Sequence, residues 1–478
     1  MTARENHKRR SERASEPPMI RSPALDSSDQ KAARPAERSR RAATTEAETR
    51  QPSGKKRTSG VTSAARAPRT SPGTPDLSVS QVSRHISLRS VPAGRIDYKL
   101  LAALGGLLCF GLVMVYSASA PAVPDDPSYW FRRELLWTGL GLVTLLITMN
   151  ISYDRWQSIS VILMFGALAL LLLVLFVGKN INGGQRWLPV GPFTFQPSEL
   201  AKLAFTMYIA DWLSRKGSQV STFMYGLVPF AILTGVVLIL VMLQNDMGTA
   251  IIIAGFALAM FITAGANLLQ LFPMLLSGAV TFALVTFSTP FRLARLAAFR
   301  DPLNCAASAS YQVCQGLIAL GSGGFTGRGL GESRQKAGYL PNPWTDSIFA
   351  VIGEELGFLG CLVLISLIVF LTYRAFRAGR RAPQMYGALL ATGVACWIAT
   401  QALLNIGSVV ALIPFTGVPL PFVSFGGSSL VTTMAAVGIL LNVSRYSTQP
   451  SFSERSDHAD TYLRRRDRRT HLPGSGRR

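Results

Sequence analysis

The sequence predicts an all-α polytopic membrane protein with about ten transmembrane helices. Of its 478 residues 49% are hydrophobic, and the mean hydropathy is +0.29. The apolar residues form uninterrupted blocks instead of the periodic stripes of a soluble domain. Residues 161–177 contain no polar side chain. In residues 224–243 the only side chains with a polar group are Tyr225 and Thr234. Because about 20 apolar residues cross the roughly 30 Å of bilayer hydrocarbon, such a block is long enough to span a membrane.

Ten blocks of this kind define a membrane domain over residues 98–444. The predicted spans are residues 98–119, 134–151, 157–178, 198–214, 224–244, 248–265, 270–288, 347–373, 385–408 and 426–444. A large loop, residues 289–346, separates the seventh span from the eighth.

Two basic tails flank this domain. Residues 1–97 carry 20 Lys and Arg against 10 acidic residues, and residues 445–478 carry 9 against 4. The first tail is rich in Pro, Ser, Ala and Arg and has almost no aromatic residues, so it cannot bury a core and is predicted to be disordered. It lacks the apolar region of a signal peptide. We expect its charge to lie near anionic lipid head groups; the alternative is a docking segment for a cytoplasmic partner.

The positive charges of the short loops predict the orientation. Lys and Arg are enriched in cytoplasmic loops. With both tails inside, the loops that contain Arg155, Arg215 and Arg374 are also inside, as an even number of spans requires. The prediction is a multi-pass protein of the cytoplasmic membrane with both termini cytoplasmic and residues 289–346 outside.

The external loop is basic but not disordered in composition. It contains an apolar run at 311–320 and four residues, 321–324, of which three are glycine. Its basic residues are Arg292, Arg295, Arg300, Arg328, Arg334 and Lys336. A solvated loop would tolerate these charges. We favour a platform for an anionic, phosphate-bearing substrate, because Arg and Lys are the usual donors to phosphate.

The five cysteines do not form a disulfide framework. Cys109, Cys361 and Cys396 lie inside predicted spans, where a free Cys behaves as a small apolar residue. Cys305 and Cys314 share the external loop and could form a disulfide, although we favour free thiols.

Any acid–base catalysis in the membrane domain depends on carboxylates. All four histidines lie in the tails, which removes the commonest general base. Four acidic residues at loops or span edges are expected to be ordinary solvated charges: Asp125, Asp126, Glu134 and Asp154. Six others lie outside or in the outer third of the predicted membrane: Glu199, Asp246, Asp301, Asp346, Glu354 and Glu355. Ionisable groups inside spans are costly, so they indicate function by default.

Two irregular segments border the same outer region. The hairpin around Arg186 leads into the span that carries Glu199 and Lys202. These two residues are three apart and share one helix face. They form either a structural ion pair or contacts to the substrate. Residues 413–429 contain three prolines and no charge, and we interpret them as a rigid re-entrant loop. Irregular backbone at membrane depth lines a cavity or is buried in protein, so both segments are expected to close an outer cavity.

Several motifs resemble the SEDS (shape, elongation, division and sporulation) family of FtsW and RodA. They occur in family order and cover nearly all of residues 98–444. The matching segments are 182–187 (Asn-Gly-Gly-Gln-Arg-Trp), 191–202, 244–249, 311–312 (Tyr-Gln), 321–331, 339–341 (Tyr-Leu-Pro), 348–360 and 419–430. Three departures stand out: Trp344 replaces a common His, Asn245 replaces a common Pro, and the spacer 303–310 is longer than usual.

The resemblance implies a peptidoglycan glycosyltransferase that polymerises lipid II on the outer leaflet and releases undecaprenyl diphosphate. It implies a class B penicillin-binding transpeptidase and other division proteins as partners, and no nucleic acid. The segment 421–429 and the long basic tails look more like the division branch, which implies a place at the division septum. The essential aspartate of the family corresponds to Asp301 in the pair Asp301-Pro302.

Glycan polymerisation requires a base for the acceptor hydroxyl and cations for the departing diphosphate. We assign Asp301 as the base and Arg186, Lys202 and Lys336 as candidate diphosphate contacts. The other predicted substrate-binding residues are Gln196, Glu199, Gln244, Asp246, Gln312 and Asp346. A divalent cation, Mg²⁺ or Mn²⁺, bridging phosphate to Asp246 is compatible with this chemistry, although the sequence has no dedicated metal motif. The alternatives are a lipid II flippase, which needs charges accessible from both leaflets, and a non-catalytic division scaffold, which needs no intramembrane charge.

Overall fold

The computed structural model describes residues 94–447 except 182–183, 192, 288–289 and 307–309. All described residues belong to one compact unit of the chain. The predicted disordered tails therefore lie outside the described residues, apart from residues 94–97 and 445–447.

The described chain is almost entirely helical, as predicted. Ten helices coincide with the ten predicted spans: α3 (Tyr98–Ser119), α4 (Tyr129–Asn150), α5 (Tyr153–Val177), α6 (Pro197–Lys216), α7 (Val228–Leu243), α8 (Met247–Thr263), α9 (Leu268–Phe287), α12 (Ile348–Arg380), α13 (Met385–Val409) and α14 (Gly427–Ser447). Short helical turns are η2 (Ala120–Ala122), η3 (Gly217–Ser221) and η4 (Phe223–Leu227). Two helices were not predicted: α10 (Pro290–Arg300) and α11 (Tyr311–Gly323), both within the external loop.

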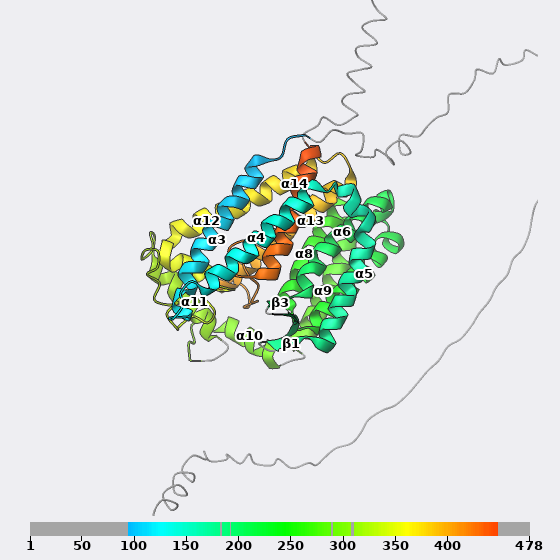
Figure 1. The fold of residues 1–478 in the computed structure, drawn as a ribbon. Coiled ribbons are helices and arrows are strands. Elements are labelled where there is room, and N and C mark those ends of the chain that lie inside the picture. The colour runs from blue at the N-terminus through cyan, green and yellow to red at the C-terminus, as the bar shows by residue number, and fades with distance from the viewer. Residues whose placement is uncertain (1–93, 182–183, 192, 288–289, 307–309, 448–478) are drawn as a thin grey trace, which may run out of the picture. The chain divides into compact units, whose positions relative to one another are not determined.

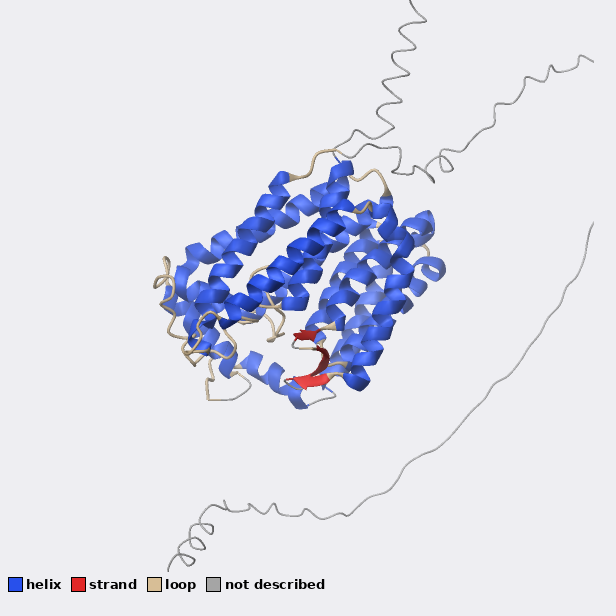
Figure 2. Cartoon of the chain, viewed as in Figure 1, coloured by secondary structure: helices blue, strands red, loops and turns tan. Residues whose placement is uncertain are grey.

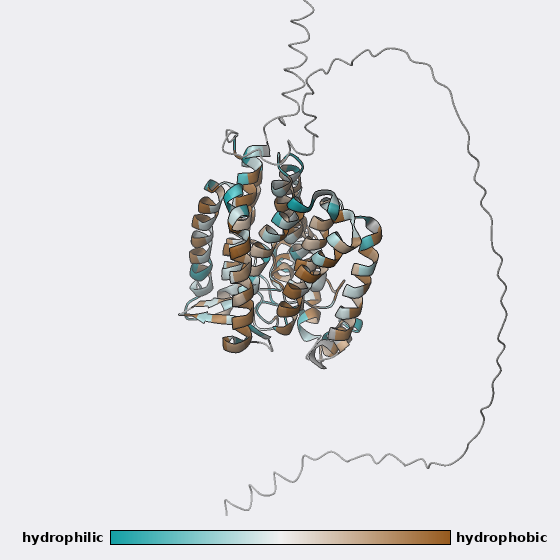
Figure 3. Cartoon of the chain, turned by 90° about the vertical axis from the view of Figure 1, so that its right-hand side faces the viewer, coloured by the Kyte–Doolittle hydropathy of each residue, from teal (hydrophilic) through white to brown (hydrophobic). Residues whose placement is uncertain are grey.

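The helices differ in hydropathy: several are apolar enough to cross a membrane, whereas α6 carries buried charged side chains. Among the described residues, six helical segments are long and apolar enough to cross a membrane: Tyr98–Ala122, Tyr153–Val177, Phe223–Leu243, Ile348–Arg380, Met385–Val409 and Gly427–Tyr446. Helix α6 falls short because it carries Glu199, Lys202 and Asp211, and these three side chains are buried. The outer helices expose apolar side chains, visible as brown ribbon in Figure 3. Apolar residues facing outward and charged residues facing inward are the arrangement expected in lipid.

Both ends of the membrane domain lie at the same end of the bundle. The backbone N–H of Gly94 donates a hydrogen bond of 2.9 Å to the carbonyl oxygen of Arg445. Helix α3 begins and α14 ends at the top of Figure 1, whereas α10, α11 and the strands lie at the bottom. This arrangement agrees with an even number of crossings.

A small antiparallel sheet follows α5 and contains the expected hairpin around Arg186 (Figure 2). Its strands are β1 (Lys179–Ile181), β2 (Gly184–Val190) and β3 (Phe193–Phe195), in the order β1-β2-β3. Leu188 pairs with Phe195 and Val190 with Phe193, across a turn that contains Gly191 at φ +58°. The sheet places Arg186 and Trp187 directly before α6.

The external loop is ordered by close packing of α11 against α12. Helix α12 is interrupted at Gly357, whose φ of 65° is left-handed. A Cβ atom at Gly323 would collide with the carbonyl oxygen of Gly353, and one at Gly357 would collide with the backbone of Gly327. Glycine at these positions therefore allows the two backbones to touch.

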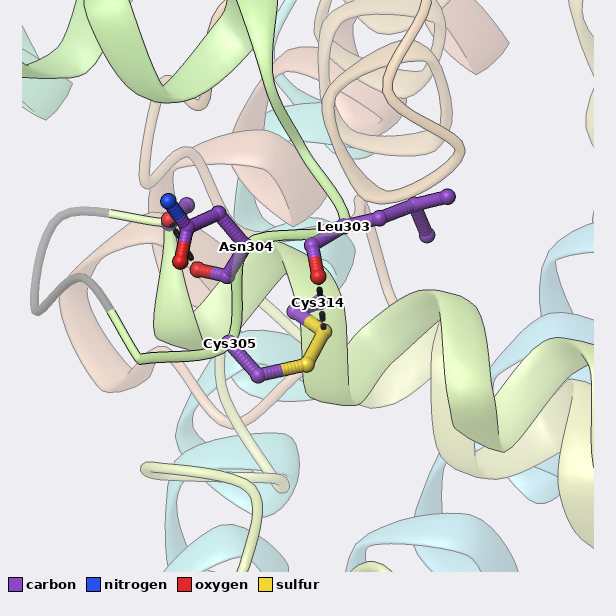
Figure 4. The surroundings of a disulfide bond; sticks show 5 residues. Leu303, Asn304, Cys305 and Cys314 are labelled. Carbon is purple, nitrogen blue, oxygen red and sulfur yellow. Dashed lines mark hydrogen bonds between the residues drawn. A yellow bond between two sulfur atoms is a disulfide. The ribbon is translucent and has the colours of Figure 1, made fainter.

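Cys305 and Cys314 form a disulfide, with their Cα atoms 5.4 Å apart (Figure 4). The expectation of free thiols at these positions was wrong. The bond joins the segment after α10 to the first turn of α11.

Residues 410–426 form the expected irregular segment between α13 and α14. Val418, Leu420 and Phe422 are buried in it, so the segment packs inside the protein. Its backbone is held by α13: the amide of Asn405 donates to the carbonyl oxygen of Val418 at 2.7 Å, and the amide of Gln401 donates to that of Pro419 at 3.0 Å. Rigid irregular backbone at this depth is satisfied by protein groups instead of water.

Candidate active site

A cavity of about 510 Å³ lies between the sheet, the irregular segment and the outer ends of several helices. Its wall combines aromatic, basic and acidic side chains. The lining residues are Trp130, Arg133, Trp137, Arg186, Trp187, Phe193, Thr194, Gln196, Glu199, Asp246, Thr249, Asn342, Trp344, Thr345, Asp346, Gly417, Val418, Pro419 and 425–429. Both predicted irregular segments line it.

The structure brings five of the ten predicted site residues into this cavity. They are Arg186, Gln196, Glu199, Asp246 and Asp346. The other five do not line it: Lys202, Gln244, Asp301, Gln312 and Lys336. The sequence motifs thus identified the cavity wall, but they also included residues that support the wall from behind.

Asp246 organises the cavity floor at the start of α8. Its Oδ1 caps the helix by accepting a 3.2 Å hydrogen bond from the N–H of Thr249. Its Oδ2 accepts from the amide of Gln196 at 2.9 Å and from the hydroxyl of Ser198 at 3.2 Å. A guanidinium nitrogen of Arg186 lies 3.6 Å from Oδ1. Asp246 therefore accepts several donors at once, and it holds Arg186 at the cavity surface.

Glu199 reaches the cavity, while Lys202 lies fully buried behind it. The two side chains form an ion pair of 2.8 Å. The Lys202 ammonium also donates to the amide oxygen of Gln401 at 3.0 Å and lies 4.7 Å from the centre of the Trp397 ring. The ammonium group is thus enclosed by protein and contacts no ligand in the cavity directly. Lys202 is the buried partner of Glu199, and its expected role as a diphosphate contact stays a prediction.

Asp346 is the carboxylate at the opposite wall, beside α11 and α12. It accepts hydrogen bonds from the Thr345 hydroxyl at 2.9 Å and from the Gln312 amide at 3.4 Å. Burial raises the pKa of Asp346, while the Thr345 hydrogen bond and the guanidinium groups of Arg295 and Arg186 oppose this shift. Gln312 therefore serves the site by positioning Asp346, not by lining the cavity.

Two arginines carry positive charge to the region around Asp346. Arg295 lies on α10 and donates to the carbonyl oxygen of Phe415 at 3.3 Å. Burial lowers its pKa, and the charge of Arg186 lowers it further, so the two guanidinium groups influence one another. Like charges held close together favour binding of an anion.

An aromatic wall completes the cavity and was missed by the sequence reasoning. The indole of Trp130 lies 5.4 Å from that of Trp344 and 5.0 Å from the Phe425 ring. The guanidinium of Arg133 lies 5.7 Å from the centres of the Trp130 and Phe193 rings. The available signal was a basic and aromatic cluster at 129–133, on the external side where Lys and Arg are uncommon.

Lys336 belongs to a second buried network, away from the cavity. Its ammonium pairs with Glu355 at 2.6 Å and donates to the hydroxyl of Ser117 at 3.0 Å. Glu354 accepts hydrogen bonds from the N–H groups of Arg334 and Gln335. These carboxylates anchor the external loop to α3 and α12, so the structure gives Lys336 a supporting position.

Gln244 is also a supporting residue. It is completely buried, and its amide donates to the carbonyl oxygen of Leu171 at 3.1 Å. This contact ties the turn before α8 to α5. The turn has a left-handed residue, Asn245 at φ 58°, where the resemblance led us to expect Pro.

Asp301 lies just after α10, exposed and outside the cavity lining. Its backbone N–H continues the helix by donating to the carbonyl oxygen of Ala297 at 3.3 Å. Arg295, six residues earlier and on α10, donates a hydrogen bond to the carbonyl oxygen of Phe415 in the irregular segment that lines the cavity. The element that carries Asp301 therefore borders the site, and the catalytic assignment of Asp301 stays a prediction.

Glu134 is buried, and the expectation that it is a solvated charge was wrong. Its carboxylate accepts a hydrogen bond from the backbone of Gly426, and its Oε2 has no hydrogen-bond partner among the described residues. A buried carboxylate at the end of the irregular segment holds the start of α14, whose first residues line the cavity. The sequence places Glu134 at the edge of a predicted span, and this position alone does not indicate that the side chain is buried.

The described donors do not form a metal site of their own. Both oxygens of Asp246 already accept hydrogen bonds from protein groups. Within the described ranges, no three His, Cys, Asp or Glu side chains gather closely enough to hold a metal ion. The donor set therefore fits a resident Mg²⁺ or Mn²⁺ poorly, because such ions require several free oxygen ligands.

Comparisons with known proteins identify relatives along most of the chain. The model of the cell cycle protein family FtsW/RodA/SpoVE matches residues 98–449. Stage V sporulation protein E of Bacillus subtilis is 41% identical over 346 residues, which cover 71% of this chain and 94% of that protein. The probable peptidoglycan glycosyltransferase FtsW of Thioalkalivibrio sulfidiphilus is 41% identical over 366 residues, covering 75% and 91%.

Solved structures share the fold. One, described as showing structural coordination of polymerization and crosslinking by a peptidoglycan synthase complex, matches with a TM-score of 0.63 and 29% identity. It covers 74% of this chain and 99% of that chain. The Rod shape determining protein RodA of Thermus thermophilus matches with a TM-score of 0.56 and 29% identity, covering 74% and 98%.

Proposed function

Because this chain belongs to the FtsW/RodA/SpoVE family of cell cycle proteins, we propose that it is a peptidoglycan glycosyltransferase that polymerises lipid II. The observation that carries the proposal is the cavity, which combines cations, carboxylates and aromatic rings at one end of a membrane bundle. Arginines recognise phosphate, and aromatic rings and carboxylates recognise the apolar faces and hydroxyl groups of sugars. A lipid-linked disaccharide diphosphate presents all of these groups.

The reaction joins an acceptor sugar to the anomeric carbon of a lipid-diphosphate donor. The acceptor hydroxyl loses its proton to a carboxylate as its oxygen bonds to that carbon, and the bond from carbon to the diphosphate oxygen breaks. The lipid diphosphate leaves with the bonding electrons, so positive groups stabilise it. Arg186 and Arg133 line the cavity and can supply this charge, and the first residues of α14, Gly427–Ser429, bring the start of a helix to the same wall.

Asp301 is proposed as the base, on the resemblance of Asp301-Pro302 to the family motif. Asp346 is the alternative within the cavity, because its raised pKa suits proton acceptance. The carboxylates of Glu199 and Asp246 are already engaged by Lys202 and by several donors. No step is assigned to a metal ion; a Mg²⁺ or Mn²⁺ would need most of its ligands from the diphosphate.

The partners and the cellular location are proposed from the relatives. A related structure is described as a peptidoglycan synthase complex that coordinates polymerization and crosslinking. We extend this to a class B penicillin-binding transpeptidase as partner of this chain, acting with other division proteins. Relatives named FtsW support a division role at the septum, although a relative named for sporulation is equally similar. Both termini are placed in the cytoplasm.

The decisive experiment measures glycan polymer formed from lipid II by the purified full-length protein. We expect Asp301→Asn to lower the rate by about 10²–10⁴-fold without lowering thermal stability, because the exposed side chain bears catalysis and not packing. Glu332→Gln is the matched control, since Glu332 is another exposed carboxylate of the external loop. It should polymerise at the wild-type rate.

The outcomes separate the candidates. Near-normal polymerisation by Asp301→Asn together with an inactive Asp346→Asn would move the base to Asp346. Absence of polymer from the wild-type protein in the presence of its transpeptidase, with translocation of lipid II in vesicles, would replace the polymerase with a flippase.

A further inference from the structure

A second cavity, of about 290 Å³, lies where α3 begins and α12 ends, at the end of the bundle opposite to the active-site cavity (Figure 1). We call it the basic pocket. Its charged lining residues are Arg95, Asp97, Lys99, Arg374, Arg377 and Arg381. Five cations thus share a small space with one carboxylate.

The single carboxylate satisfies only one of these cations. Asp97 accepts hydrogen bonds from Arg374 at 3.0 Å and 2.5 Å. It also caps α3 by accepting from the N–H groups of Lys99 and Leu100. In the described part of the chain, no hydrogen bond or ion pair engages the side chains of Arg377 and Arg381. Uncompensated like charges around one cavity create a strong positive potential that attracts an anion.

The surface next to the pocket is apolar and aromatic. Tyr98 is 66% exposed, Leu101 37% and Phe370 42%. Leu101 lies one turn beyond Tyr98 on α3, and Phe370 lies one turn before Arg374 on α12, so each shares a face with a pocket residue. Tyrosine is enriched at the membrane–water interface. Apolar surface beside a cluster of cations fits a ligand that has both a charged head and hydrocarbon chains.

The length of α12 places the pocket at the level of the lipid head groups. After the interruption at Gly357, residues 358–380 correspond to about 35 Å of helix, which exceeds the roughly 30 Å of bilayer hydrocarbon. The last turns of α12, which carry Arg374, Arg377 and Arg381, therefore emerge from the hydrocarbon. The predicted topology assigns this end to the cytoplasmic leaflet.

We propose that the basic pocket binds the phosphate head group of an anionic phospholipid of the cytoplasmic leaflet. Arg377 and Arg381 supply charge-assisted hydrogen bonds to the phosphate oxygens. The exposed apolar surface of α3 and α12 accommodates the acyl chains. Free inorganic phosphate shares the charge of the head group, but it cannot use the apolar surface.

Native mass spectrometry of the detergent-purified full-length protein tests the proposal. We expect phosphatidylglycerol to remain bound and phosphatidylcholine not to. Arg377→Gln should weaken phosphatidylglycerol binding about fivefold, since one basic residue near an anionic lipid surface contributes about that factor. Arg377→Gln with Arg381→Gln should weaken it further. Arg380→Gln is the matched control, because Arg380 lies on the same turn but does not line the pocket.

Thermal unfolding in phosphatidylcholine shows whether a variant loses lipid binding only because its fold is less stable. Removing an uncompensated cation should leave the unfolding midpoint unchanged. Arg381→Gln alone provides a second site of substitution, at an exposed residue. The proposal is overturned if Arg380→Gln weakens binding as much as Arg377→Gln, because the attraction is then diffuse. It is also overturned if excess inorganic phosphate displaces the lipid, because the pocket is then a site for free anions.

Discussion

Some of the predicted site residues line the active-site cavity, and others lie behind its wall and hold the lining residues in place. Glu199 and Lys202 illustrate the difference, because they share one helix face but only Glu199 lines the cavity. Lys202 instead bridges Glu199 to Gln401, whose amide holds the backbone of Pro419 in the irregular segment. A charge pattern in the sequence identifies the pair, but only the packing of α13 shows which partner is enclosed.

Replacement of the Glu199–Lys202 pair distinguishes support from substrate contact. Lys202→Met should destabilise the protein by about 3–5 kcal/mol, because it leaves the Glu199 carboxylate buried without its partner. The double variant Glu199→Gln with Lys202→Met should recover most of this loss and retain some polymerisation. Thermal unfolding in detergent and lipid II polymerisation measure the two effects. A stable double variant with no activity at all would instead support a direct electrostatic role for the pair.

The buried carboxylate of Asp346 predicts a pH-dependent stability. Burial raises its pKa in the folded state, so the folded protein binds this proton more tightly than the unfolded chain. Stability should therefore fall as the pH rises from about 4, the unfolded-state pKa, until it passes the folded-state pKa. Asp346→Asn removes this loss. The unfolding midpoint of the variant, relative to that of the wild type, should therefore rise as the pH increases to neutrality.

Thermal unfolding at several pH values, with Glu332→Gln as control, measures this difference. A constant difference between Asp346→Asn and the wild type across the pH range would contradict the prediction.

Whole elements could be predicted from the sequence wherever length and apolarity determine them. All ten predicted spans are helices because an uninterrupted apolar block in a bilayer must satisfy its own backbone hydrogen bonds. The hairpin around Arg186 was expected, but the bounds of strands β1 to β3 were not, because the strands are only three to seven residues long. Helix α11 was recognised only as an apolar run, since its burial depends on glycine contacts with α12.

The candidate active site was predictable from the sequence only in part, like the fold. Arg186 and Asp246 were found because they belong to recognisable motifs. Gln401 and Asn405 were not found, since buried amides within an apolar helix carry no pattern and act only through the folded irregular segment.

The disulfide should stabilise the element that carries Asp301. Cys305 and Cys314 are nine residues apart, and a cross-link that closes a loop of this size contributes about 2–3 kcal/mol. Cys305→Ser with Cys314→Ser should lower the unfolding midpoint and reduce polymerisation, because the segment after Asp301 is no longer fixed to α11. Cys361→Ser is the control for loss of a thiol. Unchanged activity of the double variant would mean that the position of Asp301 does not depend on this bond.

At the scale of the whole molecule, the bundle has two chemically different ends. One carries the cavity, the sheet and the helices of the external loop, and the other carries the start of α3, the end of α14 and the basic pocket. Their separation along the bundle agrees with a polymerase that acts on one leaflet while its opposite end contacts the other. A transporter would require a continuous polar path between them. The described core between the ends is mostly apolar, although α6 also buries Lys202, Thr206 and Asp211.

Single cysteines introduced at opposite ends test this orientation. After removal of all native cysteines, a probe at Leu303 should react with an impermeant thiol reagent in intact cells, because Leu303 is 70% exposed in the external loop. A probe at Arg380 should react only after the membrane is permeabilised. External labelling at Arg380, or at Ser451 in the C-terminal tail, would reverse the topology and with it the leaflet of every site.

The bond between Cys305 and Cys314 also has a consequence for how the protein is made. The cytoplasm keeps thiols reduced, so a disulfide forms only after its segment has been exported. On the predicted topology, helix α11 can therefore be fastened to the segment that carries Asp301 only once α9 has delivered the loop across the bilayer. A newly inserted chain would be incomplete until an extracytoplasmic oxidant acts on it, and the time needed for this oxidation would separate insertion from the onset of cell-wall synthesis.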